Sequence, residues 1–222
     1  MSLLARLWLD LAMFTLMVAS FGYHFTGNTW HEVLGFGFVA LAGVHNGLSW
    51  RWYRAMPRGR YRSRRILSTA VNSLLLVACV TMIVSGLANS RLIETYLGVK
   101  TDMVPRRVHS TAAYWTLVLV SVHVGLHTSV IAGEVTRSVG MAAPFRQFAV
   151  TLSGVLAVVL AFGVYAVFDR DLCAKLFAVY SFDFWDPSFP PLLFFSEYVA
   201  IALVCATLGH WIAKCAKHGA RC

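Results

Sequence analysis

The chain has 222 residues, of which 58% are hydrophobic and only 13% are charged, and its mean hydropathy is +0.66. Soluble globular proteins carry about 25% charged residues, so this chain has too little polar surface to cover a water-soluble fold. The net charge of +9 would suit a nucleic-acid-binding protein, but the basic residues lie mainly in loops between long apolar runs, which excludes that class. The composition therefore predicts an integral membrane protein.

Six runs without a charged residue follow one another along the chain, the last interrupted only by Glu197. They cover residues 11–31, 33–50, 66–90, 108–133, 147–168 and 187–213. A membrane-spanning helix needs about 20 apolar residues, with a range of roughly 17–25. The first run is longer than the apolar part of a signal peptide, and no small-x-small cleavage site follows it. We therefore predict an all-α protein with six transmembrane helices, of which the first is retained.

Positive charge is concentrated between the second and third runs, where residues 51–65 read RWYRAMPRGRYRSRR, with seven arginines and no acid. Cytoplasmic loops of membrane proteins carry an excess of Lys and Arg. If this loop is cytoplasmic, thirteen of the nineteen basic residues lie on the cytoplasmic side. We therefore expect both termini in the cytoplasm and an attraction between the loop and anionic membrane lipids.

Two similar phrases each place a histidine inside an apolar run: VHNGLSW contains His45, and VHVGLHT contains His123. His45 follows His31 by 14 residues, and His123 follows His109 by 14 residues. Fourteen residues are about 3.9 turns and about 21 Å of helix rise. His31 and His45 therefore lie on one face of their helix, and His109 and His123 lie on one face of theirs. These are the second and the fourth of the six predicted helices, and because successive spanning helices alternate in direction, the two run the same way. The pattern predicts two histidine pairs at two depths, His31 with His109 outside and His45 with His123 inside, and a parallel repeat of the first two helix pairs.

Two imidazoles facing each other across a helix bundle are a typical haem site. Polar side chains inside a bilayer are costly and usually functional. The five cysteines form no Cys-x-x-Cys-His motif, which argues against covalent c-type attachment. We therefore predict two haems b, one in each histidine pair. Small residues on the same two helices would either give the macrocycle room or let helices pack closely: Gly35, Ala42, Gly43, Gly47, Ala112, Ala113 and Gly125.

His127 is a second candidate at the inner site, because it follows His123 by one turn and lies close to the same face. It could replace His123 as the ligand, contact a propionate of the inner haem or line a quinone pocket. Ser49 takes its place in the first copy of the repeat, which favours His123 as the ligand. We do not expect the remaining histidines to be ligands: His24, His210 and His218.

Three classes of function use such residues. The first is an electron-transfer cytochrome linked to quinone, and a membrane reductase of ferric iron or another external acceptor is its nearest variant. A transition-metal permease would use the same histidines, because imidazole binds Zn, Cu, Fe and Ni, but it would also carry acids or methionines through its core. A scaffold or assembly factor leaves the matched histidines unexplained. The pattern favours the electron-transfer cytochrome.

The chain resembles a bacterial family of six-helix dihaem membrane cytochromes b, often called flavinylation-associated cytochromes. The resemblance runs through HEVLGFGFVALAGVHNGLSWRWY, VSGL, HSTAAYWTLVLVSVHVGLH and FFSEYVAIALVCATLGHWIAK. More loosely, the chain is similar to the cytochrome b subunits of membrane hydrogenases, formate dehydrogenases and nitrate reductases. The resemblance implies a bacterial cytoplasmic membrane and haem ligands at His31, His45, His109 and His123.

The resemblance also implies electron transfer between the quinone pool and an extracytoplasmic redox protein, which could be a flavoprotein, a cytochrome c or an iron–sulfur protein. The chain would then be the cytochrome b component of a quinone-linked oxidoreductase. We expect residues 1–133 to form the four-helix dihaem bundle, and residues 134–222 to form a helical hairpin with an aromatic outer loop and a basic cytoplasmic tail. Polar candidates for a quinone pocket are Glu32, His24 and Glu197 outside, and His127 and His210 inside.

Overall fold

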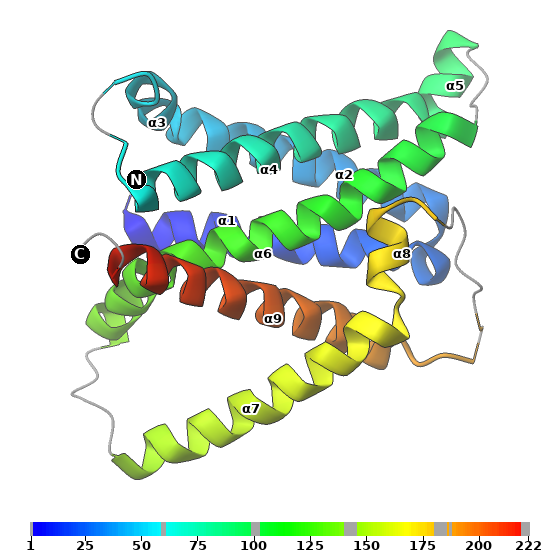
Figure 1. The fold of residues 1–222 in the computed structure, drawn as a ribbon. Coiled ribbons are helices and arrows are strands. Elements are labelled where there is room, and N and C mark those ends of the chain that lie inside the picture. The colour runs from blue at the N-terminus through cyan, green and yellow to red at the C-terminus, as the bar shows by residue number, and fades with distance from the viewer. Residues whose placement is uncertain are drawn as a thin grey trace.

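The computed structural model of the chain describes residues 2–58, 61–98, 103–139, 146–179, 186 and 188–218. Within these ranges all regular structure is α-helical, which confirms the predicted all-α class. Six long helices run back and forth along one direction, and three short helices lie at the ends of the molecule (Figure 1). The long helices are α1 (Leu3–Phe21), α2 (Tyr23–Leu48), α4 (Ser63–Ala88), α6 (Met103–Val139), α7 (Arg146–Asp169) and α9 (Pro191–His218), and the short ones are α3 (Trp50–Ala55), α5 (Arg91–Leu97) and α8 (Leu172–Leu176).

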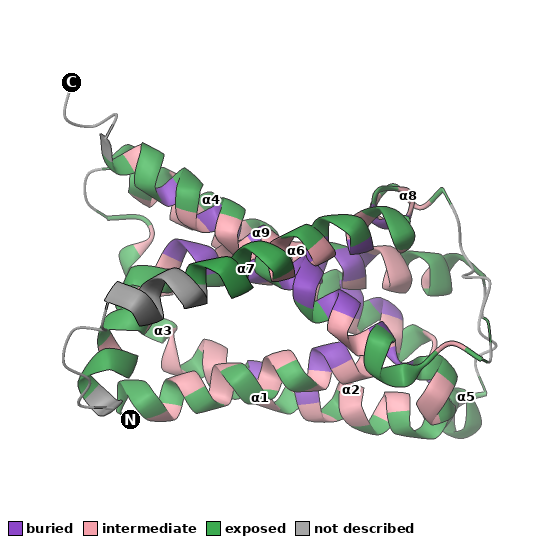
Figure 2. Cartoon of the chain, turned by 90° about the horizontal axis from the view of Figure 1, so that it is seen from below, coloured by how far each residue is buried: buried purple, intermediate pink, exposed green. Residues whose placement is uncertain are grey.

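The two ends of the molecule differ in what they hold. Both chain termini and α3 lie at one end, which we call the basic end because the arginine-rich loop is there, and α5 and α8 lie at the opposite end (Figures 1 and 2). The helices therefore alternate in direction along the chain, and α2 and α6 both run from the opposite end to the basic end.

Among the described residues, four helices are long and apolar enough to cross a membrane: Leu3–Phe21, Ser63–Ala88, Met103–Arg137 and Pro191–Lys217. A shorter apolar helix covers Ser153–Asp169. The helix α2 is not one of the four, and its sequence includes three histidines, two asparagines and Glu32. The chain is thus a helical protein with several segments able to cross a membrane.

The first hairpin turns earlier than the charge pattern indicates. The uncharged run extends from residue 11 to residue 31, and the 14-residue spacing already placed His31 with His45 on the second helix. The turn between the two helices lies well inside this run, because α1 ends at Phe21 and α2 begins at Tyr23. A Cβ on Gly22 would come within 2.6 Å of the Phe195 ring, so glycine lets this turn pack against α9. His24 and His31 consequently belong to α2. A second glycine, Gly27, then kinks α2 with a φ of 75°, a conformation that favours glycine.

The second hairpin consists of α4 and α6, joined through α5. Ser90 caps α5 by accepting a hydrogen bond from the Ile93 N–H at 3.4 Å, and Gly98 follows α5 in the left-handed conformation with a φ of 64°. The helix α6 has 37 residues, which correspond to about 55 Å. Because the apolar core of a bilayer is about 30 Å thick, α6 is long enough to extend beyond both of its faces.

The core lies where α6 and α9 cross, and buried residues gather there, whereas α1, α2 and α7 are mostly exposed or half-buried (Figure 2). Leu117 of α6 and Ile201 of α9 are completely buried. A Cβ on Gly125 would overlap the carbonyl oxygen of Ala206, so the two helices touch through their backbones. Close crossing at small residues is typical of helix pairs in membranes.

The helix α8 ties the C-terminal part of the chain to α6. The Trp115 Nε1–H donates a hydrogen bond to the carbonyl oxygen of Leu176 at 2.9 Å, and the Arg107 guanidinium donates to the carbonyl oxygen of Ala178. Hydrogen bonds to these two carbonyls hold the segment that follows α7 across the opposite end of the molecule.

Candidate functional site

His31 of α2 and His109 of α6 face each other near the opposite end of the molecule, and we call them the opposite-end pair. Their ring centroids are 5.9 Å apart, and the ring planes are at 84° to each other. The His31 Nδ1 lies 2.9 Å from the carbonyl oxygen of Ser20 in α1. The His109 Nδ1 lies 2.8 Å from the carbonyl oxygen of Met82 in α4. The structure therefore brings together the two histidines that the sequence predicted as the outer pair.

Gly86 of α4 makes room for the His109 ring. A Cβ at this position would come within 2.9 Å of both Cε1 and Nδ1 of His109. The ring can approach the α4 backbone, and so reach the Met82 carbonyl, because position 86 carries no side chain.

His45 and His123 lie further along the same two helices, toward the basic end, and we call them the basic-end pair. The His45 Nδ1 lies 2.7 Å from Oδ1 of Asp10 in α1. The His123 Nδ1 lies 2.7 Å from Oδ1 of Asn72 in α4. The side chains of His45 and Asp10 are 34% and 42% exposed, so this end of the first hairpin is open.

All four histidines share one protonation pattern. Carbonyl, carboxylate and amide oxygens only accept hydrogen bonds, so each Nδ1 that faces such an oxygen carries the proton. The lone pair of a neutral imidazole is then on Nε2, where a metal would bind. Metal-ligating histidines nearly always donate their other N–H to an oxygen in this way, which orients the ring and raises its basicity.

The residues that accept hydrogen bonds from the four histidines are also equally spaced in the two hairpins. Asp10 and Ser20 of α1 are ten residues apart, and so are Asn72 and Met82 of α4. Each histidine is therefore held by the long helix that precedes its own, at equivalent positions of the two hairpins. This match supports the predicted repeat of α1–α2 in α4–α6.

The two rings of the opposite-end pair are close enough together to bind one metal between them. Two imidazoles that bind one metal at about 2.0 Å from each nitrogen place their ring centroids on the order of 6 Å apart, and the observed separation is 5.9 Å. Within the described residues, no three His, Cys, Asp or Glu side chains gather as a metal site. A pair of imidazoles on opposite sides fits a haem, whose macrocycle supplies the other donors.

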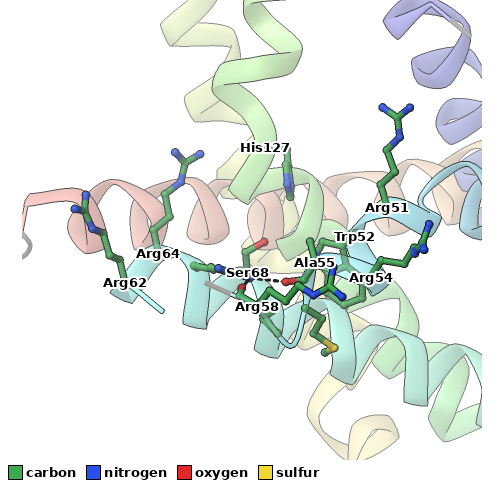
Figure 3. A pocket seen from close by; sticks show the side chains of 12 residues that line it. Arg51, Trp52, Arg54, Ala55, Arg58, Arg62, Arg64, Ser68 and His127 are labelled. Atoms are coloured by element: carbon green, nitrogen blue, oxygen red, sulfur yellow. Dashed lines mark hydrogen bonds between the residues drawn. The ribbon is translucent and has the colours of Figure 1, made fainter. Parts of the chain in front are cut away.

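His127 is held differently from the four paired histidines. Its Nδ1 donates to the carbonyl oxygen of His123 in its own helix at 2.9 Å, and the two rings are 4.7 Å apart. No residue of another helix therefore holds its Nδ1. The His127 ring instead lines an open cavity of about 1000 Å³ at the basic end, between α6 and the segment that joins α3 to α4 (Figure 3).

Of the remaining histidines, His24 lies on α2 and His210 on α9. His24 is exposed at the start of α2, with its ring 5.7 Å from that of Tyr23. His210 is half-buried in α9, next to Trp211. The side chain of His218 lies outside the described residues.

The small residues divide into two groups. Gly125 packs against the backbone of α9 and has no space beside it, so close helix packing is the one of its two predicted roles that the structure shows. A Cβ on Gly43 or Gly47 would meet no atom within 4 Å. These two glycines are each two residues from His45, about 200° round the helix, so they lie on the other face of α2. Only Gly35, Ala42, Ala112 and Ala113 remain as small residues for a macrocycle.

The two predicted outer carboxylates both have protein partners. Glu32 accepts hydrogen bonds from the Asn28 side chain at 2.8 Å, from the Ser90 hydroxyl at 3.1 Å and from the Arg91 N–H at 2.8 Å, and so joins α2 to the start of α5. Glu197 is 1% exposed and is paired with the Arg170 guanidinium. Both carboxylates therefore have a structural role: Glu32 joins α2 to α5, and Glu197 joins α9 to the end of α7.

Sequence reasoning missed the acceptors of the histidines. Asp10 lies just before the first uncharged run, and Asn72 lies inside the third as an uncharged polar residue. The available signal was the equal ten-residue spacing from Asp10 to Ser20 and from Asn72 to Met82, but two of these four acceptors are backbone atoms that carry no sequence signal. No protein-family model, curated protein or solved structure matches the chain.

Proposed function

We propose that the chain is a dihaem cytochrome b that carries electrons across a membrane. The observation that carries the proposal is the matched arrangement of four histidines, each with Nδ1 bound to an oxygen of the preceding long helix and with Nε2 left as the ligand atom. A single histidine with one hydrogen-bond partner can have a purely structural role. Four histidines at equivalent positions of two hairpins, at two levels, are better explained as two pairs of ligands.

In this proposal His31 and His109 hold one haem b, and His45 and His123 hold the other. A bound haem supplies an iron that accepts and returns one electron. The oxygens at Nδ1 keep each imidazole in one tautomer and one orientation, so that the ligand atom is in place before the haem binds. About 21 Å of helix separates the two levels, so the pairs would carry electrons along the length of α2 and α6.

We infer that all six long helices span the membrane. Four are long and apolar enough by themselves, and the alternating direction of α1, α2, α4, α6, α7 and α9 (Figure 1) supports two more crossings by α2 and α7. The arginines between α3 and α4 favour a cytoplasmic basic end by the positive-inside rule. Both termini would then be cytoplasmic, in the inner membrane of a bacterium.

We propose that residues 1–133 form the haem-binding bundle and residues 134–222 a supporting hairpin. The contacts of α9 with α6 and of α8 with α6 support this role, because they fix the helix that carries His109 and His123.

The proposed electron partners are a quinone and an extracytoplasmic redox protein. Glu32 and Glu197 would be the proton-exchanging groups of an outer quinone pocket, and His127 or His210 those of an inner one. The hydrogen bonds that hold both carboxylates favour the inner face, where His127 lines an open cavity.

Liposomes test electron transfer directly. The purified protein is reconstituted with a water-soluble quinol outside and an impermeant electron acceptor enclosed. We expect quinol-dependent reduction of the enclosed acceptor, and we expect the variant His45→Ala/His123→Ala to abolish it. Haem-loaded protein that passes no electrons from quinol to the acceptor in either orientation would contradict the proposed role.

A further inference from the structure

The cavity at the basic end has six arginines in its wall and no acidic side chain: Arg51, Arg54, Arg58, Arg62, Arg64 and Arg65. Figure 3 shows His127 reaching into the opening from α6, with Arg62 and Arg64 on one side of it and Arg51 and Arg54 on the other. The acidic side chains that pair with His45, Arg137 and Arg170 do not line the cavity. This concentration of positive charge favours the binding of an anion.

Arg65 has a structural role and shapes the cavity. Its Nη2 donates to the carbonyl oxygen of Ala55 at 2.8 Å and also to that of Arg58, and its guanidinium lies 4.5 Å from the centre of the Tyr61 ring. These contacts bind the end of α3 to the start of α4. The other five arginines line the same opening.

The start of α4 adds further anion-binding groups. The helix begins at Ser63 without a side-chain cap, and the start of a helix carries the positive end of its dipole. The Ser68 and Thr69 hydroxyls also line the cavity. Guanidinium forks, backbone N–H groups and hydroxyls together are the donors that bind phosphate.

We propose that this cavity binds the phosphate of an anionic phospholipid headgroup. The position favours a lipid over a soluble phosphate compound, because the apolar helix α4 begins at the cavity and Trp52 of α3 lines it. Trp50, two residues earlier in α3, is 61% exposed. Tryptophan marks the level of the lipid headgroups. The inference does not rest on the haems.

Native mass spectrometry of the full chain in detergent tests this site. The protein is titrated with phosphatidylglycerol, with cardiolipin, with the zwitterionic phosphatidylcholine and, separately, with inorganic pyrophosphate. The pocket variant is Arg62→Gln/Arg64→Gln. The matched control is Lys214→Gln/Lys217→Gln, which removes the same charge from the end of α9 without touching a residue that lines the cavity.

We expect both anionic lipids to bind more tightly than phosphatidylcholine. The pocket variant is expected to weaken this binding on the order of thirtyfold, which corresponds to two lost basic contacts, and the control to stay close to wild type. Equal binding of all three lipids, equal losses in both variants, or tight binding of pyrophosphate alone would each overturn the proposal.

Two further variants separate lipid binding from misfolding and from haem binding. If the first pocket variant does not fold, Arg54→Gln/Arg58→Gln makes the same test on the opposite wall. His123→Ala, which removes a proposed haem ligand, is expected to keep the lipid affinity. A pocket variant that loses haem while its lipid affinity is unchanged would assign the arginines to the haem carboxylates and contradict the lipid site.

Discussion

At the opposite end of the molecule two backbone carbonyl oxygens, of Ser20 and Met82, hold the histidines, whereas at the basic end the side chains of Asp10 and Asn72 do so. The helical register and the Nδ1 contacts are otherwise the same. A backbone acceptor is supplied by any residue that keeps the helix intact. A side-chain acceptor depends on one residue type and can bring its own charge.

The comparison teaches that one scaffold can hold two similar histidine pairs in different electrostatic surroundings. Asp10 is an acid next to His45, and no side chain takes the corresponding role beside His31. Hydrogen bonds and charges around a ligand tune the potential of its metal. We therefore expect the two proposed haems to have different midpoint potentials, and the following variants to act on one pair at a time.

Removing both ligands of one pair should have the largest effect. The variants His31→Ala/His109→Ala and His45→Ala/His123→Ala are each expected to lose one of the two haems and to keep the other low-spin, because the pairs lie at separate levels. The haem-to-protein ratio and low-temperature EPR measure this. Loss of both haems in a folded double variant, or of neither, would show that the pairs are not independent ligand sets.

The same measurements should distinguish the role of His123 from that of His127. His123→Ala is expected to lose the basic-end haem or to leave it high-spin, because Asn72 holds the Nδ1 of His123 and leaves Nε2 for the proposed iron. His127→Ala is expected to keep two low-spin haems, because its Nδ1 is held only by its own helix. The reverse pattern would assign the basic-end haem to His127.

The variant Gly86→Ala should disturb only the opposite-end pair. The new Cβ would come within 2.9 Å of the His109 ring, which would then leave the Met82 carbonyl. We expect lower occupancy or a high-spin signal at that haem and an unchanged basic-end haem. Gly154→Ala in α7 is the control, because a Cβ there meets no atom within 4 Å. An unaffected opposite-end haem in Gly86→Ala would contradict the close fit of His109 to α4.

Changing the basic-end acceptors should have a smaller effect, visible in a redox titration. Asp10→Asn removes a negative charge that favours ferric iron, so the midpoint of the basic-end haem is expected to rise. Asn72→Asp is expected to lower it. A charged hydrogen bond exceeds a neutral one by about 1 kcal/mol, which corresponds to roughly 40 mV for one electron.

Ser20→Ala is the matched control at the opposite end. Its hydroxyl donates to the carbonyl oxygen of Leu16 at 2.8 Å, whereas His31 is bound to the backbone oxygen of Ser20. We expect no shift of either midpoint. A shift in Ser20→Ala as large as that in Asp10→Asn would remove the distinction between backbone and side-chain acceptors.

Hydropathy and spacing predicted much of this arrangement. The helical class follows from the uncharged runs, and the 14-residue spacing predicted that His31 would lie beside His109. The turn at Gly22 could not be predicted from charge, because it depends on the contact with Phe195, a residue far away in the chain. The role of Gly125 could not be predicted for the same reason. Only the folded position of α9 shows that the space beside Gly125 is filled by a neighbouring helix.

The acceptors show a different limit. The carbonyls of Ser20 and Met82 are backbone atoms and leave no trace in residue type. Asp10 and Asn72 do leave one, as polar residues in apolar helices, but their role depends on the pairing of α1 with α2 and of α4 with α6. The sequence pattern thus identified the ligand candidates, whereas the groups that orient them became visible only in the folded chain.

The most direct measurement of the central claim is the haem content of the purified wild-type chain. A pyridine haemochrome assay against the protein concentration is expected to give two haems b per chain, both low-spin. A ratio near zero, in protein produced with sufficient haem and folded as a helical membrane protein, would contradict the assignment of the four histidines as haem ligands.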